Sequence, residues 1–196
     1  MTQNTINEGN RFQYIKDPVA LSLTNGLARC MVHAKFDDIR TSDILEESGV
    51  SRSTFYRHYR DKYDMVNSNY QVLLDETLGS IEEGMSFTQS FKAIYRVLRS
   101  DPDFYCNALT SVEPDGLRHY IYQQTYRNHM HLLTKAGVDM KTTYNRFLLT
   151  GYISGAMTIT AIWAENGMKE DESVLLNLIY ELMPDVFRKV FFIHFA

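Results

Sequence analysis

Cysteine, proline and glycine are all scarce in this sequence, with 2, 4 and 10 copies in 196 residues. Cys30 and Cys106 are too few for a disulfide framework or a cysteine-based zinc site. The low proline and glycine content, together with 44% hydrophobic residues, excludes a largely disordered chain. Because the chain is also long enough to bury a proper core, we expect a compact globular protein.

Motifs that carry catalysis are missing as well. The chain contains no GxSxG, GxGxxG, Walker loop or HExxH, patterns that would support nucleophilic, cofactor or zinc chemistry. His129 and His131 stand two apart on an expected helix, where side chains point in nearly opposite directions, so they cannot share a metal ion. We therefore expect no enzyme activity, no cofactor and no metal site.

Signals for export or membrane insertion are weak. Residues 1–16, MTQNTINEGNRFQYIK, are polar and have no apolar core before a small-residue cleavage site. We interpret them as a flexible leader and expect a cytoplasmic protein. The uncharged run at residues 147–164 reaches only the lower edge of a membrane-spanning length. A helix buried in a core or a subunit interface is the favoured interpretation, and a membrane span is the weaker alternative.

Alternating strand patterns are absent, and helical periodicity extends from Pro18 to Phe192. The sequence therefore predicts an all-α fold, with Pro184 kinking or restarting the last helix. Gly26 is unexpected in the middle of the first helix, where it costs about 1 kcal/mol relative to Ala. The expected helices lie near residues 18–33, 41–49, 52–59, 61–84, 87–99, 103–110, 116–136, 141–165 and 171–193. The predicted helix caps are Asp17, Thr41, Ser51 and Asp61.

The residue composition changes near residues 80–86. Basic residues cluster before this point, and long helices rich in Tyr, Phe, Leu and Met follow it. We predict a helix-turn-helix DNA-binding domain over residues 17–80, built as a three-helix unit. Residues 81–196 are predicted to form a helical effector-binding and dimerisation domain.

One stretch, GVSRSTFYRHYRDKYD at residues 49–64, is locally basic although the chain carries a net charge of −4. Preceded by TSDILEES, it has the pattern of two short helices joined by a glycine-containing turn, which is typical of a helix-turn-helix. Ile44, Val50, Phe55 and Tyr59 are expected to form its small core. The alternative interpretation is a solvated face whose arginines pair with Asp43, Glu46 and Glu47.

The outward side chains of this stretch each suit a task on duplex DNA. Arg52 can contact guanine with two hydrogen bonds, and Ser53 and Thr54 can donate to base edges or phosphates. The remaining candidates would bind the DNA backbone, and they are Tyr56, His58, Lys62 and Thr41. Base reading and positioning would thus be divided among different residues.

Residues from about Asp17 to Leu78 resemble the N-terminal DNA-binding region of the TetR family of bacterial transcription regulators, above all through SGVSRSTFYRHYRDKYDM. The resemblance implies a three-helix DNA-binding unit that a long fourth helix joins to an all-helical ligand-binding and dimerisation domain. The positions that it implies as DNA contacts are Thr41, Ser42, Arg52, Ser53, Thr54, Tyr56, His58 and Lys62. The rest of the chain resembles, more weakly, the subgroup that includes activators of dihydroxyacetone kinase operons.

Aromatic residues crowd the second domain, which suits a pocket for an apolar or flat effector. Tyr126, His129, Phe147 and Trp163 are the nominated ligand-binding residues. Ordinary helix packing is the alternative for each of them, because aromatic side chains also fill cores.

Two apolar helices near the C-terminus predict a homodimer. Residues 147–164 are apolar, and residues 174–191 repeat apolar side chains at helical spacing. A homodimer would place two helix-turn-helix units on a palindromic operator. The predicted function is an effector-responsive transcription regulator of the TetR type, whose sign of regulation, repressor or activator, the sequence does not give. The alternative is a helical adaptor that binds another protein and whose basic patch is incidental.

Overall fold

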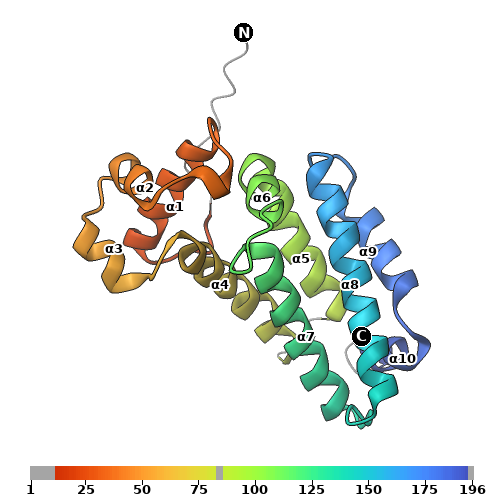
Figure 1. The fold of residues 1–196 in the computed structure, drawn as a ribbon. Helices are drawn as coiled ribbons and strands as arrows, with labels where there is room; N and C mark the ends of the chain where they lie inside the picture. Colours follow the sequence, from red (N-terminus) through yellow and green to blue (C-terminus); the bar gives the residue numbers. More distant parts are fainter. Residues whose placement is uncertain (1–11, 83–85, 194–196) are drawn as a thin grey trace.

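The computed structural model describes residues 12–82 and 86–193, and all regular structure in those residues is helical (Figure 1). The prediction of an all-α fold is therefore confirmed. Its elements are α1 (Pro18–Met31), the 3₁₀ helix η2 (Phe36–Asp38), α2 (Thr41–Ser48), α3 (Arg52–His58), α4 (Lys62–Glu82), α5 (Phe87–Ser100), α6 (Pro102–Leu109), α7 (Leu117–Lys135), α8 (Thr143–Glu165), α9 (Glu172–Leu182) and α10 (Asp185–Ile193). The expected restart at Pro184 separates α9 from α10.

Helices α1, α2 and α3 form a small unit at one side of the molecule, and α4 leads from it toward the larger group α5 to α10 (Figure 1). The predicted domain boundary near residues 80–86 falls at the end of α4. Gly84, the predicted end of that helix, lies outside the described residues.

Gly26 allows α1 and α2 to approach each other closely. A Cβ atom at Gly26 would lie 2.8 Å from the Cβ of Ser48 and 3.0 Å from the carbonyl oxygen of Ile44. Both distances are too short for a methyl group, so only glycine fits without movement of α2. The glycine that looks unfavourable for helix formation is thus required by packing between helices.

The start of α2 differs from the prediction. Thr41 does not cap the helix, because it is already the first helical residue, and the preceding residue is Arg40. The Asp43 carboxylate accepts the backbone N–H of Arg40 at 2.8 Å, which fixes this end of the helix from inside. The predicted caps at Asp17, Ser51 and Asp61 are confirmed, since each side chain accepts a first-turn backbone N–H.

The segment before α1 is not a flexible leader over its described part. Phe12, Tyr14 and Ile15 are buried. The ring of Phe12 lies 4.8 Å from that of Phe104 in α6, and the hydroxyls of Tyr14 and Tyr105 are 2.7 Å apart. The prediction is wrong from residue 12 onward because these apolar side chains have partners distant in sequence. Residues 1–11 lie outside the described residues.

Helix α6 also holds the end of α1 and the turn that follows. The Asn107 carboxamide accepts the backbone N–H of Phe36 at 2.8 Å and donates to the carbonyl oxygen of Ala34 at 2.9 Å. The Ser111 hydroxyl donates to the Asp37 carboxylate at 2.6 Å. The N-terminal unit is therefore joined to the second group of helices by polar contacts in addition to α4.

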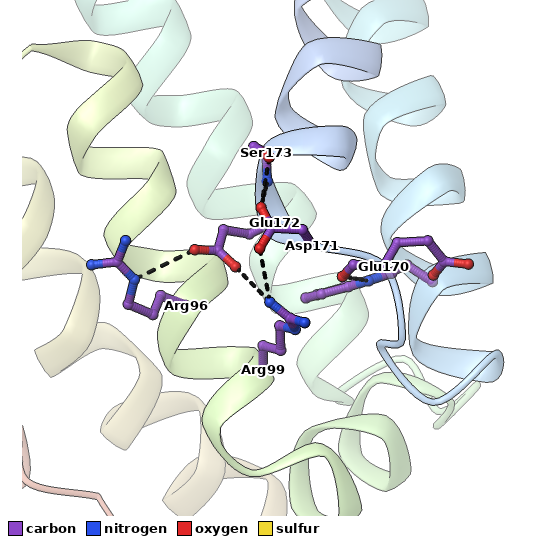
Figure 2. A network of polar contacts seen from close by, with 7 residues as sticks. Arg96, Arg99, Glu170, Asp171, Glu172 and Ser173 are labelled. Atoms are coloured by element: carbon purple, nitrogen blue, oxygen red, sulfur yellow. Dashed lines mark hydrogen bonds and ion pairs between the residues drawn. The ribbon is translucent and has the colours of Figure 1, made fainter.

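An ion-pair network connects α5 to the start of α9 (Figure 2). Arg99 donates to both Asp171 and Glu172 at 3.1 Å, and Arg96 lies 3.4 Å from the other oxygen of Glu172. Hydrogen bonds from Ser173, with the nearby Arg99, lower the pKa of Asp171 to about 2. Because Glu172 is buried, these arginines stabilise its charge and fix where α9 begins.

Helix α8 combines a buried and an exposed side. Of the described helices, it alone is long and apolar enough to cross a membrane by length and composition. Leu149 and Ile153 are fully buried, whereas Tyr144 and Phe147 are each 72% exposed. A Cβ at Gly155 would lie 3.3 Å from Leu182, so α9 packs closely there. A single chain therefore buries only one side of this helix.

Candidate functional site

A rigid turn positions α3 relative to α2. Gly49 ends α2 with a φ of +69°, a left-handed conformation that favours glycine, and the Ser51 side chain accepts the N–H of Thr54 to begin α3. Phe55 and Ile44 are fully buried, and Tyr59 is 9% exposed. These three predicted core residues anchor α3 by one side and leave its other side free.

The outward face of α3, formed by Arg52, Ser53, Tyr56 and Arg57, is exposed to solvent. The guanidinium carbon of Arg52 lies 5.4 Å from the centre of the Tyr56 ring, a cation–π contact that orients the arginine side chain. His58, at the end of the helix, is also exposed. The structure thus brings Arg52, Ser53 and Tyr56 together on one accessible surface.

Among the described residues, Arg60 pairs with Asp64 at 3.4 Å, whereas the arginines of α3 have no acidic partner. In the described parts of the chain, no ion pair joins Arg40, Arg52 or Arg57 to a carboxylate. Glu47 pairs with Arg29 of α1 at 3.0 Å, and Asp43 caps its own helix. Two of the three acids that were expected to neutralise α3 in the alternative interpretation are therefore used elsewhere, and the third, Glu46, forms no ion pair with these arginines in the described residues.

Lys62 has a different role from the predicted phosphate contact. Its ammonium group donates to the backbone carbonyl oxygens of Phe36, Asp37 and Ile39 at 2.6, 2.8 and 2.7 Å. The side chain is 7% exposed, and burial lowers the pKa of its ammonium group. Because an ammonium has three protons, none remains for a phosphate. In this structure Lys62 ties α4 to the turn around η2.

The first turn of α2 lies beside the outward face in sequence and offers further donors. Thr41 is half-buried and Ser42 is exposed. They occupy the first two helical positions, where backbone N–H groups lack partners within the helix. Such groups, with the positive end of the helix dipole, attract phosphate oxygens. On α3, the Thr54 hydroxyl accepts from Ser51 and keeps its own proton for donation.

A second site lies within the larger group of helices. A cavity of about 410 Å³ opens between α4, α5, α7, α8 and α9, a volume in the usual range for small-molecule sites. This central cavity is lined mainly by aromatic and aliphatic side chains. Tyr70, Gln71 and Asp75 contribute from α4, the helix that begins at the N-terminal unit of α1, α2 and α3.

Of the nominated ligand residues, only His129 lines the central cavity. Phe147 is 72% exposed, because it lies on the outer side of α8. Trp163 is buried and donates its indole N–H to the Glu170 carbonyl oxygen at 3.1 Å. Tyr126 stacks on Tyr122 with ring centres 6.3 Å apart. The cavity lies in the region that is rich in aromatic residues, but periodicity could not tell which aromatic side chains face inward.

The α4 residues of the cavity were missed by sequence reasoning. Tyr70 and Leu74 lie on α4, and the predicted domain boundary near residue 80 assigned this part of the helix to the first domain. The signal was the length of α4, because its 21 residues extend beyond what a three-helix unit can cover.

His129 is the most unusual polar residue of the cavity. It is 1% exposed, and its Nδ1 lies 2.8 Å from the carbonyl oxygen of Thr125. Burial lowers its pKa to about 4, so the ring is neutral at pH 7. Its other nitrogen, Nε2, is buried and has no hydrogen-bond partner in the described residues.

Comparison with known protein families identifies both halves of the chain. A family model described as "Bacterial regulatory proteins, tetR family" matches residues 24–68. A second model, described as "Transcriptional regulator C-terminal region", matches residues 86–185. None of the curated proteins matches the chain. The first match includes α2, α3 and the outward face, and the second includes most of the lining of the central cavity.

Proposed function

This chain belongs to the TetR family of bacterial transcription regulators, and we propose that it binds a palindromic operator as a homodimer whose DNA affinity is controlled by an effector. The observation that carries the proposal is the outward face of α3, where accessible and unpaired cations stand on a helix fixed by buried residues. A rigid, cationic helix of this kind suits the major groove of DNA.

The proposed contacts follow from the geometry of α2 and α3. Arg52 would read a guanine with two hydrogen bonds, worth about 1–3 kcal/mol of base discrimination. Ser53 and Thr54 would donate to base edges or phosphates. The proposed phosphate contacts are Tyr56, His58, Thr41 and Ser42. Lys62 would act indirectly, because it holds α4 against the turn that leads into α2.

The proposed dimer interface is the exposed apolar side of α8, α9 and the start of α10. The apolar side chains that repeat over residues 174–191 divide into two groups. Leu175, Ile179, Phe187 and Val190 are buried within the chain, whereas Val174, Leu178, Leu182 and Val186 are 42–48% exposed. Phe147 and Ile162 of α8 add to the exposed group. Two copies would cover this side by forming a four-helix interface.

Gly151 supports the same assignment. A Cβ built at this position would meet no heavy atom within 4 Å, so its surface is open in the isolated chain. It lies on the exposed side of α8, between Phe147 and Ile162, where a partner helix would benefit from close approach. A subunit interface explains the apolar character of α8 without a membrane. We therefore place the protein in the cytoplasm.

Effector control would act through α4. An occupant of the central cavity would contact Tyr70 and Asp75, which lie on the helix whose first turn holds the DNA-binding unit through Lys62. A ligand shifts an equilibrium only if it binds one arrangement better than another. A change in the direction of α4 would alter the separation of the two copies of α3 and thus their fit to the operator.

Operator binding is tested by a mobility shift with DNA from upstream of the protein's own coding sequence. Arg52→Ala and Tyr56→Ala should each weaken specific binding at least tenfold and leave the dimer intact, since both side chains are exposed. Arg127→Ala is the matched control, because Arg127 is an exposed arginine on α7. Affinity should fall steeply between low and high salt, as counterions are released from phosphates.

The result also separates the regulator from a helical adaptor. An adaptor with an incidental basic patch would bind unrelated DNA as well as the upstream fragment, with no effect of Arg52→Ala on sequence preference. Loss of the dimer in the Arg52 variant would show that the side chain is structural and would overturn the assignment of the outward face.

A further inference from the structure

We propose that the central cavity accepts an uncharged aromatic molecule that donates an O–H or N–H hydrogen bond to Nε2 of His129. This inference rests on the proposed function, because it gives a chemical class to the effector of that same cavity. It depends on which polar hydrogen atoms of the lining residues are already donated in hydrogen bonds within the protein.

The protonation of His129 follows from its neighbours. A carbonyl oxygen only accepts hydrogen bonds, so Nδ1, which lies 2.8 Å from the Thr125 oxygen, carries the proton of the neutral ring. The remaining nitrogen, Nε2, therefore has a lone pair and no proton. It is buried without a partner in the described residues. Because His129 lines the cavity, a donor from a molecule in the cavity would satisfy this acceptor.

The hydroxyl protons of two other lining residues, Tyr95 and Thr160, are also donated within the protein. The Thr160 hydroxyl donates to the Ala156 carbonyl oxygen at 2.9 Å. Tyr95, whose hydroxyl is 2.8 Å from Thr160 Oγ1, must therefore be the donor in that contact. Its oxygen retains only lone pairs for a ligand. Tyr70, Tyr152 and Asn128 can donate or accept, so they do not oppose a donor.

The charge of the lining excludes an anionic occupant. No Lys or Arg is among the described residues that line the cavity, and Asp75 contributes a carboxylate from α4. One oxygen of that carboxylate accepts from Gln71 at 2.6 Å, which leaves the other available to a donor. A carboxylate or phosphate ligand would lose its hydration and meet no cation in return.

The surroundings of His129 favour a flat ring. Phe87, Phe91 and Tyr152 line the cavity with ring centres 5.6, 5.9 and 5.7 Å from that of His129. Aromatic rings pack favourably in offset or edge-on arrangements at such distances. A hydroxyl or N–H group on an aromatic ring would meet Nε2 while the ring filled the apolar part of the cavity.

The test compares three probes with the same ring system, namely 2-naphthol, 2-methoxynaphthalene and 2-naphthoate, by isothermal titration calorimetry of the full chain. Only 2-naphthol is both neutral and a donor. It should bind about tenfold more tightly than 2-methoxynaphthalene, the effect expected for one buried neutral hydrogen bond. The anionic 2-naphthoate should bind more weakly than either.

His129→Phe removes the acceptor and keeps an aromatic ring among aromatic neighbours. In this variant the preference for 2-naphthol over 2-methoxynaphthalene should fall to about one. Equal affinities in the wild-type protein, a preference that persists in the variant, or no binding of any probe would each overturn the proposal. The comparison of probes in the wild-type protein needs no variant. It therefore still tests the proposal if the His129→Phe protein fails to fold.

The two proposals fail in different measurements. Operator binding by the unliganded protein in the mobility shift decides the regulator, and it does not depend on the cavity. Specific operator binding without the probe preference would leave the regulator intact and remove only this ligand class. Probe preference without operator binding would do the reverse.

Discussion

The outward face of α3 and the central cavity both contain polar atoms without protein partners, and the same observation has a different meaning in each. Arg52 is exposed, so water satisfies its donors, and its lack of a partner costs nothing in the free protein. Nε2 of His129 is shielded from water, and an unmade hydrogen bond there costs about 1–3 kcal/mol. An exposed unpaired group indicates accessibility, whereas a buried one indicates a missing partner.

Lys62 and Arg52 show the same contrast between two cations ten positions apart. Both were assigned to DNA from their residue type and spacing. Arg52 is exposed and lies against the ring of Tyr56, while Lys62 donates to three carbonyl oxygens. The presence of a cationic residue in the sequence therefore does not predict what that residue binds unless the burial of its side chain is also known.

The largest expected effect is a difference in stability between variants that replace each of these two cations with a neutral side chain. Lys62→Met should lower the free energy of unfolding by about 3 kcal/mol, because several buried carbonyl groups lose their donor. Arg52→Ala should leave it within about 0.5 kcal/mol, as expected for an exposed site. Urea unfolding at fixed protein concentration measures both. If Lys62→Met unfolds like the wild-type protein yet loses affinity for DNA, the original phosphate assignment would be restored.

The next effect is a pH dependence of stability caused by His129. Its pKa is about 4 in the folded protein and 6.5 in the unfolded chain. Between these values the unfolded chain binds a proton that the folded protein does not, so stability falls as pH is lowered through this window. Between pH 7 and pH 5 the loss is about 2 kcal/mol.

His129→Phe provides the reference for this measurement, because it lacks the titrating group and other carboxyls contribute equally to both proteins. The wild-type protein should lose about 2 kcal/mol more than the variant between pH 7 and pH 5 when unfolding is followed with urea. Parallel losses in the two proteins would mean that water or another group already reaches Nε2, and the contrast with the exposed face would disappear.

A smaller effect separates two glycines, one at a buried contact and one on an open surface. Gly26→Ala should destabilise the protein by about 1–2 kcal/mol, since overpacking against Ser48 and Ile44 exceeds the gain in helix propensity. Gly151→Ala meets no atom within the chain and should not destabilise the monomer fold. Thermal melting gives the first result, and analytical ultracentrifugation shows whether Gly151→Ala weakens a dimer.

The sequence predicted the helices and the inward residues of the helix-turn-helix because both depend on local spacing. Phe55 and Tyr59 stand four positions apart, which places them on one side of the chain, and Ser51 caps a helix that begins at the next residue. Phe12, Lys62 and Gly26 were misjudged because their contacts come from distant helices. Of the nominated ligand residues, His129 lines the cavity, while Phe147 and Trp163 do not. Residue type alone therefore does not predict which way a side chain points. Tertiary packing, invisible to periodicity, decided these cases.

The smallest expected effect compares the loss of one hydroxyl at a buried and at an exposed tyrosine. Tyr14→Phe leaves the hydroxyl of Tyr105 without its partner at 2.7 Å, and Tyr105 is only 2% exposed. The free energy of unfolding should fall by about 1 kcal/mol. Tyr56→Phe removes an exposed hydroxyl and should leave stability unchanged while weakening DNA binding, because a phosphate contact is lost. Urea unfolding and mobility shifts on both variants would test whether one chemical deletion separates the two kinds of polar group. A drop in stability for Tyr56→Phe equal to that for Tyr14→Phe would show that the outward face is part of the packed structure.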